Sequence, residues 1–205
     1  NKRLCVCKSN IAPLIYEIGL KYKELNQKTK IDFRIQIEKE EMLLFFDKEI
    51  VTIVLDNLIS NAIKYTEQGC ITLSLYQTVR NEVAYTEIKV SDTGYGISAE
   101  ALPHIFDRYY QESGKHQASG TGIGLALVKN LVELHEGEIR AESVQNEGST
   151  FCISLLTDNI YPNALHADST EPAAKEDTAQ ATTSENTSEP TVDNGKPILL
   201  IVEDN

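Results

Sequence analysis

The chain has 205 residues, of which 41% are hydrophobic, and its formal net charge is -12. This length suffices for one sizeable domain with a tail or for two small domains, and the hydrophobic fraction is ordinary for a globular core. The charge is uneven, because residues 158–205 hold ten acidic residues and two lysines. The rest is only mildly acidic, which excludes a strongly basic nucleic-acid-binding surface. No apolar run reaches membrane-spanning length, so we expect no membrane contact by this chain.

Four cysteines, at positions 5, 7, 70 and 152, lack the spacing of metal ligands. We interpret them as reduced, small apolar residues of a cytoplasmic protein. The chain has no signal-peptide pattern. Because it begins without a methionine, we expect it to be a fragment of a longer protein.

The first third of the chain alternates predicted strands and helices. A short strand at residues 3–8 precedes a helix that Ser9 or Asn10 caps and that ends near Thr29, since its apolar residues follow 3-4 spacing. The next elements are a half-buried strand at residues 31–37, a short strand at residues 42–46 and a long helix from Asp47 to Thr66.

Two long strands follow, at residues 70–80 and 82–91, and residues 92–96 form a turn. Ser98 caps a short helix that Pro103 interrupts, and the polar residues 107–121 are typical of a mobile loop. A helix to His135 and strands at residues 138–144 and 150–156 complete the domain. This order predicts an α/β fold, a two-layer sandwich with a mixed, mostly antiparallel sheet and helices on one face.

The C-terminal part differs in composition. Residues 158–196 are rich in Thr, Ser, Ala, Pro and acidic residues, and such a segment cannot bury enough apolar surface to offset its ordering entropy. We expect a flexible acidic linker there. Residues 197–205 then run from five apolar residues into Glu203 and Asp204, which is typical of the first buried strand of another α/β domain. An unspecialised hydrophobic strand is the alternative.

A glycine-rich loop, Ser119 to Leu125, precedes the last predicted helix. Glycine permits positive φ and close approach of a ligand to the backbone, and the helix start offers free N–H groups and the positive end of its dipole. This combination suits a phosphate, although tight turns need glycine as well.

Asn57, Asn61 and Lys64 lie one turn apart on the predicted helix from Asp47, and therefore project from one side. Asparagine has poor propensity in a helix interior, so two of them call for a reason. They are either polar residues of a wet helix face or an amide ligand for a hard cation such as Mg²⁺, with a lysine for phosphates.

Asp92 and the glycines at positions 94 and 96 follow a buried strand. An aspartate at a strand end can accept a hydrogen bond from an exocyclic amine, and the two glycines would let a flat base lie against the backbone. An ordinary turn is the alternative for this stretch.

Together these stretches resemble the sequence boxes of the sensor histidine kinases, which occur here in family order over about residues 10–157. The five matching segments are residues 56–66 (asparagine box), 92–97 (first glycine box), 105–110 (phenylalanine box), 120–125 (second glycine box) and 148–151 (the short box before the last strand). The resemblance implies the catalytic ATP-binding domain of a histidine kinase, an α/β sandwich shared with gyrase B and the heat-shock chaperone ATPases. ATP and Mg²⁺ are the implied cofactors.

The resemblance also implies roles for single residues. Asn61 would bind Mg²⁺, Asn57 would support the phosphate–metal end, and Asp92 would receive the adenine amine. A bridging water would be held by Ser149 or Thr150. The other residues implied at the ATP site are Lys64, Tyr65, Gly94, Gly96, Ile97, Arg108, Tyr109, Gly120, Thr121, Gly122, Ile123, Gly124 and Leu125. Residues 107–121 would form the lid over the triphosphate.

The family's phosphorylated histidine lies on a separate helical hairpin, and none of the four histidines here has its sequence context. The resemblance therefore implies that this chain holds ATP while the dimerisation hairpin, absent here, supplies the acceptor. The tail resembles the start of a receiver domain, in which Glu203 and Asp204 would help to bind Mg²⁺. The expected whole is a homodimeric hybrid sensor kinase of a bacterial two-component system, cytoplasmic or anchored in the inner membrane.

Two other functions fit the same fold, namely an ATP-hydrolysing conformational switch and a non-catalytic nucleotide-binding module. The hydrolysing gyrase branch carries a glutamate four residues before the metal-binding asparagine, and this position is Asn57 here. An amide cannot act as a general base, which favours the kinase.

Overall fold

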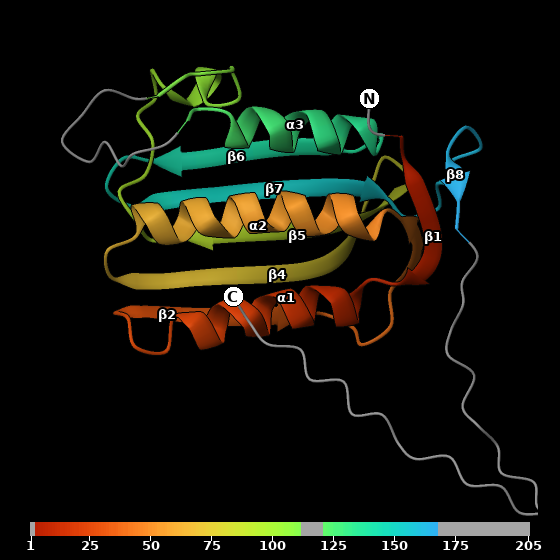
Figure 1. Ribbon diagram of the computed structural model, residues 1–205, viewed down its shortest axis with the longest axis horizontal. Coiled ribbons are helices and arrows are strands. Elements are labelled where there is room, and N and C mark those ends of the chain that lie inside the picture. The colour runs from red at the N-terminus through yellow and green to blue at the C-terminus, as the bar shows by residue number, and fades with distance from the viewer. Residues whose placement is uncertain (1–2, 112–120, 168–205) are drawn as a thin grey trace, which may run out of the picture. The chain divides into compact units, whose positions relative to one another are not determined.

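Residues 3–111 and 121–167 are described by the structure, which is a computed structural model. Figure 1 shows the helices α1, α2 and α3 on one face of a large sheet. The elements in chain order are β1 (Cys5–Asn10), α1 (Ala12–Leu25), β2 (Ile31–Ile37), β3 (Leu43–Phe46), α2 (Lys48–Tyr65), β4 (Gly69–Arg80), β5 (Val83–Asp92), the short 3-10 helix η1 (Leu102–His104), α3 (Gly124–Leu134), β6 (Glu138–Val144), β7 (Gly148–Leu156) and β8 (Leu165–His166).

The main sheet has five strands in the order β2-β4-β5-β7-β6. The β2–β4 pair is parallel and the three other pairs are antiparallel. With the helices packed on one face (Figure 1), this confirms the predicted two-layer α/β sandwich with a mixed, mostly antiparallel sheet.

The core lies between the helices and this sheet. Helix α2 buries Ile50, Val54, Leu58 and Ala62, which are spaced four residues apart, against this sheet. Leu73, Ile88 and Ile153 face them from the sheet. This packing leaves the polar side of α2 free to form a site.

The start of α2 is fixed by Asp47. Its Oδ1 accepts hydrogen bonds from the backbone N–H groups of Glu49 and Ile50, at 3.0 and 3.1 Å, which is the N-cap that an aspartate before a helix predicts. Its Oδ2 accepts from Cys5 N at 3.0 Å, so the same carboxylate ties β1 to the helix.

Helix α1 ends at Leu25, four residues before the predicted end near Thr29. Asn26 closes it, because its side-chain amide and its backbone N–H both donate to Tyr22 O. The N-cap is Ile11 and makes no side-chain bond, while Asn10 Oδ1 accepts from Ala12 N at 3.2 Å and from Met42 N at 2.9 Å. Asn10 therefore accepts a hydrogen bond from the first turn of the helix and also joins it to the segment before β3.

The expected linker does not begin at residue 158. Tyr161 is 1% exposed, and β8 pairs in parallel with β1, with Cys5 opposite Leu165. Residues 158–167 therefore belong to the domain, because one buried tyrosine and a short strand pairing hold them there. Strands β3, β1 and β8 form a second, three-stranded sheet. The expected linker beyond this segment and the expected strand at 197–205 lie outside the described residues.

His135 directly follows α3 and links this helix to two other parts of the chain. It is 1% exposed, its Nε2 accepts from Asp47 N at 3.0 Å, and its Nδ1 lies 2.9 Å from the Tyr161 hydroxyl. The Tyr161 hydroxyl also donates to His135 O at 3.1 Å. Burial lowers the pKa of His135, so the ring is a neutral structural link between α2, α3 and the C-terminal segment.

Candidate nucleotide site

The polar side of α2 carries Asn57, Asn61 and Lys64 as predicted. Asn57 Nδ2 donates to Ile53 O at 2.8 Å, which fixes its amide, whereas no group in residues 3–111 or 121–167 hydrogen-bonds the Asn61 side chain. Lys64 Nζ lies 4.9 Å from the centre of the Tyr65 ring. Asn61 and Lys64 are therefore available for a ligand, while Asn57 is already positioned.

Helix α3 starts beside Asn57. A Cβ atom on Gly124 would lie 3.0 Å from Asn57 Oδ1, so the absence of a side chain at Gly124 lets the two helices approach there. In the described part of the chain no side chain caps α3, whose N-cap is Ile123. The N–H groups of its first turn are thus open to an anion, close to the asparagines of α2.

Tyr109 and Gly122 meet at the base of the predicted lid. Tyr109 N donates to Gly122 O at 2.8 Å, both residues have a φ of 66°, and a Cβ on Gly122 would lie 2.8 Å from Tyr109 Cα. Only glycine fits at residue 122 without displacing this contact. Residues 112–120, which include Gly120 and most of the predicted lid, lie outside the described residues.

Other residues that were predicted to contact ATP lie near Tyr109 and Gly122. Arg108, Tyr109, Thr121 and Ile123 are exposed, and Leu125 is half-buried against the core. The side chain of Arg108 is exposed and therefore accessible to a phosphate.

Asp92 is the last residue of β5 rather than the first residue beyond it. Its Oδ1 accepts from Gly94 N at 2.9 Å. Burial raises the pKa of its carboxyl, while the N–H groups of Gly94 and Ser149 and the Thr66 hydroxyl favour the charged form. The Thr66 hydroxyl is buried and makes no hydrogen bond of good geometry within the described residues. A carboxylate beside a hydroxyl with an unused hydrogen-bonding capacity suits the amine of a base.

The glycines after Asp92 allow close backbone contacts. A Cβ on Gly94 would lie 2.2 Å from Tyr65 O, and Tyr95 N donates to that same oxygen at 3.1 Å. Gly96, at a φ of 66°, would place a Cβ 2.1 Å from Val144 O. The turn is therefore held between the end of α2 and the end of β6, with its backbone beside Asp92.

The two residues predicted to hold a bridging water lie on opposite faces of the sheet. Ser149 pairs with Asp92 and shares its face, whereas Thr150 pairs with Ser91 and donates to the Ser91 hydroxyl at 3.0 Å on the other face. Of the two, Ser149 is the one beside Asp92. The alternation of buried Phe151 and Ile153 along β7 is the sequence signal that could have selected it.

Ser143 on β6 belongs to this site although the sequence analysis did not select it. Its Oγ accepts from Ile97 N at 2.8 Å, donates to Gly148 O at 2.8 Å and lies 2.9 Å from the Ser149 hydroxyl. A single serine in an exposed edge strand carries no pattern that distinguishes it, so only the fold could reveal the contact.

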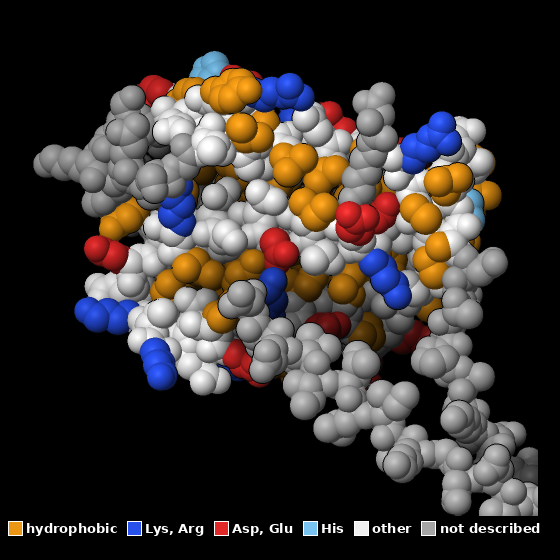
Figure 2. Space-filling view, in the orientation of Figure 1, with side chains coloured by type: hydrophobic (Ala, Val, Ile, Leu, Met, Phe, Trp, Pro, Cys, Tyr) orange, Lys and Arg blue, Asp and Glu red, His pale blue; other side chains and the backbone are white. Residues whose placement is uncertain are grey.

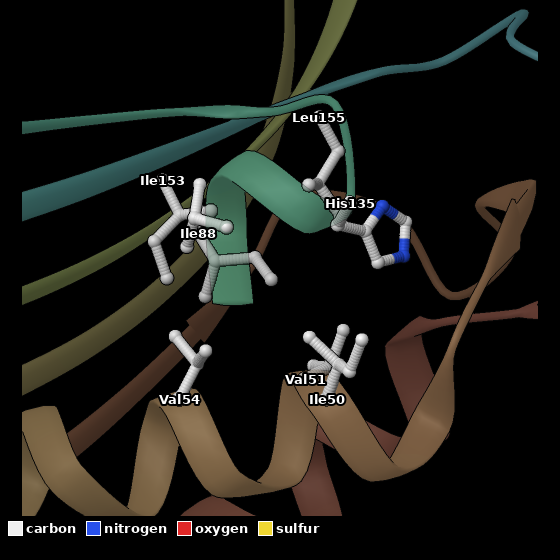
Figure 3. Close-up of a pocket in the computed structure, with 8 residues that line it drawn as sticks. Ile50, Val51, Val54, Ile88, His135, Ile153 and Leu155 are labelled. Atoms are coloured by element: carbon white, nitrogen blue, oxygen red, sulfur yellow. The ribbon is translucent and has the colours of Figure 1, made fainter. Parts of the chain in front are cut away.

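Figure 3 shows a small apolar cavity elsewhere, between α2, α3 and the sheet. Helix α2 lines this cavity with Ile50, Val51 and Val54. The other lining residues come from the sheet and from α3 and its end, and are Ile88, Val132, His135, Ile153 and Leu155. It shares no residue with the polar site and is part of the core.

The described residues contain no cluster of three or more His, Cys, Asp and Glu that could hold a metal, and the four cysteines are free. On the helix-covered face, charges of both signs are scattered (Figure 2). None of the helices that the structure describes is long and apolar enough to cross a bilayer.

Residues 46–159, more than half of the chain, match the family described as histidine kinase-, DNA gyrase B- and HSP90-like ATPase. The chain belongs to this family. The match spans every described element of the polar site, from α2 to β7.

Similar curated proteins are sensor histidine kinases. The chain is 34% identical over 135 residues to sensor histidine kinase WalK of Bacillus subtilis, an alignment that covers 64% of this chain and 22% of WalK. It is 37% identical over 147 residues to the autoinducer 2 sensor kinase/phosphatase LuxQ of Vibrio vulnificus, which covers 70% of this chain and 16% of LuxQ. The chain thus spans a small part of these relatives.

Solved structures agree with the fold. The nucleotide-free catalytic domain of histidine kinase ThkA superposes with a TM-score of 0.63 at 26% identity, covering 75% of this chain and 99% of that chain. Full-length ShkA in complex with AMPPNP superposes with a TM-score of 0.65 at 21% identity, covering 75% of this chain and 31% of ShkA.

Proposed function

We propose that this chain binds ATP with Mg²⁺ and presents the γ-phosphoryl group to a histidine on a separate dimerisation hairpin. The observation that carries the proposal is the difference between the two asparagine side chains on α2. The Asn57 amide is fixed against Ile53 O, and the Asn61 amide, one turn further, makes no bond to any described residue. An uncommitted amide oxygen beside a lysine and an open helix start fits a metal–polyphosphate ligand.

At the base end, Asp92 accepts from the adenine amine, and the backbone at residues 94–97 lies against the ring. At the phosphate end, Lys64, Arg108 and the first N–H groups of α3 neutralise phosphate oxygens. Mg²⁺ would be held by Asn61 Oδ1 and the phosphates, and when bound it would offset charge on the transferred group. These residues act by positioning and by electrostatic stabilisation, which is what phosphoryl transfer demands of a protein.

Transfer is favoured over hydrolysis because the helix offers no carboxylate to activate water. Asn57 stands where the hydrolysing branch has its glutamate. The neighbouring acid, Asp56, is engaged towards α1, where its Oδ1 accepts from Tyr22 Oη at 2.8 Å and from Lys21 Nζ at 3.2 Å. The Asp56 carboxylate, held in this ion pair, is turned away from the asparagine side of α2 and is not placed to act as a general base there.

The finer identity is also part of the proposal. We infer a two-component hybrid sensor kinase that is a homodimer through its hairpin, with this domain in the cytoplasm. A receiver domain would begin at residues 197–205, where Glu203 and Asp204 would contribute to its Mg²⁺ site. The names of the relatives support a sensor kinase, and the acidic end of residues 197–205 supports the receiver domain.

The first test is phosphorylation of the hairpin histidine in the full-length protein with labelled ATP and Mg²⁺. Asn61→Ala should lower the initial rate at least a hundredfold, because the metal loses its protein ligand. Asn130→Ala, an asparagine on the exposed side of α3, serves as the matched control and should keep the wild-type rate. A wild-type rate in Asn61→Ala would refute the metal role, and rapid ATP hydrolysis without histidine labelling would favour the conformational switch.

A further inference from the structure

A polar row crosses three strands at one end of the main sheet. Asp92 on β5 pairs with Ser149 on β7, and Ser149 pairs in turn with Ser143 on β6. Residues directly opposite in antiparallel strands point to the same face, so the three side chains line up beneath the turn at residues 94–97. The function proposed above uses Asp92, and the family resemblance implies a bridging water at Ser149, whereas neither gives Ser143 a role.

The hydrogen bonds around Ser143 fix where each proton lies. A hydroxyl has one proton and can accept two hydrogen bonds. Ser143 donates that proton to Gly148 O at 2.8 Å, because a carbonyl can only accept. The 2.9 Å contact with Ser149 must therefore be a bond from the Ser149 hydroxyl to Ser143 Oγ, which also accepts from Ile97 N.

We propose that Ser143 is a positioning residue that sets nucleobase selectivity by holding the Ser149 hydroxyl proton away from the base. This inference rests on the proposed function. Because the Ser149 hydroxyl donates its proton to Ser143, Ser149 Oγ can only accept a hydrogen bond from the base. The Asp92 carboxylate likewise can only accept. Two acceptors side by side favour a purine with an amine at position 6, directly or through water, and disfavour a purine with a carbonyl there.

Removing the Ser143 hydroxyl would free the Ser149 proton. Ser149 could then turn and donate to a 6-carbonyl, so inosine triphosphate, the 6-oxo counterpart of ATP, would gain a bond that the wild type denies it. ATP would lose little, because Asp92 still accepts from its amine. One neutral hydrogen bond corresponds to about a three- to tenfold change in affinity.

The test is calorimetric titration of the 205-residue chain with ATP and with inosine triphosphate, each with Mg²⁺. Ser143→Ala should lower the ratio of the two affinities about three- to tenfold, and Ser143→Thr, which keeps the hydroxyl, should restore it. Ser74→Ala, a serine on β4 bonded at 3.5 Å to Gln36, is the control and should leave the ratio unchanged. The effect should vanish in a Ser149→Ala background, where no proton remains to be freed.

A role of Ser143 in folding alone would weaken both nucleotides equally, so an unchanged ratio would overturn the proposal, as would failure of threonine to rescue it. An effect that persists in Ser149→Ala would equally overturn it. If the wild-type chain bound neither nucleotide, the proposed function itself would fail along with the inference. Thermal unfolding of each variant establishes that the ratio is measured on folded protein.

Discussion

Asp92 combines a cost in stability with a proposed role in binding the base. Its folded-state pKa is raised because burial disfavours the charged carboxylate. Between its ordinary value of 3.8 and the raised value, the folded protein holds more protons than the unfolded chain. The free energy of unfolding therefore falls as pH rises through that window, and above it the charged, buried Asp92 remains a net penalty.

Asp92→Asn removes this penalty and the negative acceptor together. At neutral pH we expect an unchanged or higher midpoint of thermal unfolding and at least a tenfold loss of ATP affinity, because a hydrogen bond to a charged acceptor is lost. Asp158→Asn changes the same charge at an exposed site and should alter neither quantity. Unchanged ATP affinity in a folded Asp92→Asn variant would contradict the role of Asp92 in binding the base.

His135 predicts a pH dependence of opposite sign. Burial lowers its pKa below 6.5, against smaller raising effects of its own backbone carbonyl, Asp47 and Glu136. The unfolded chain then binds more protons than the folded one below about pH 6.5, so stability rises with pH through this window and is lost on acidification. His135→Gln should flatten the slope of unfolding free energy between about pH 5 and 7, measured by urea denaturation. An equal slope in both proteins would exclude His135 as its source.

Among the elements, α2 depends most on its cap. Asp47 satisfies two N–H groups of the helix and one of β1. Asp47→Ala should therefore cost about 2 kcal/mol of unfolding free energy, at the upper end of the range for N-caps. Asp158→Ala, which removes an acid without a helix to cap, is the control for charge, and denaturant unfolding is the measurement. A loss below 0.5 kcal/mol, the low end for a cap, would mean that the helix start does not depend on this carboxylate.

Site residues placed by a local sequence pattern could be predicted, whereas those placed by pairing between distant strands could not. The common side of the asparagines on α2 was predictable because a helix fixes the relation of residues four apart. The position of Asp92 near the end of a strand was predictable because a glycine-rich turn follows it, although Asp92 is the last residue of β5 itself. Ser143 was not predictable, because its importance comes from pairing of β6 with β7, which brings together segments with no shared local pattern. The buried Tyr161 was masked by the polar composition of its surroundings.

At the scale of the molecule, the C-terminal segment contributes to the stability of the domain. Tyr161 is 1% exposed and its hydroxyl is bonded to His135. Tyr161→Ala should lower the free energy of unfolding by about 3–5 kcal/mol, the range for large aromatic truncations in cores. The neighbouring Ile160, 62% exposed, is the control, and its change to alanine should cost less than about 0.5 kcal/mol. Equal effects of the two would mean that residues 158–167 do not stabilise the fold.

Helix α2 is hydrogen-bonded at both of its ends to other parts of the domain. At its start, Asp47 is bonded to β1 and to His135, which in turn contacts Tyr161. At its end, Tyr65 O accepts from the turn that follows Asp92. In mechanical terms the helix is a strut about 27 Å long, clamped at both ends, that carries Asn57 and Asn61 along its span. A displacement of the three-stranded sheet along this axis would reach the turn that follows Asp92 through this single hydrogen-bonded helix.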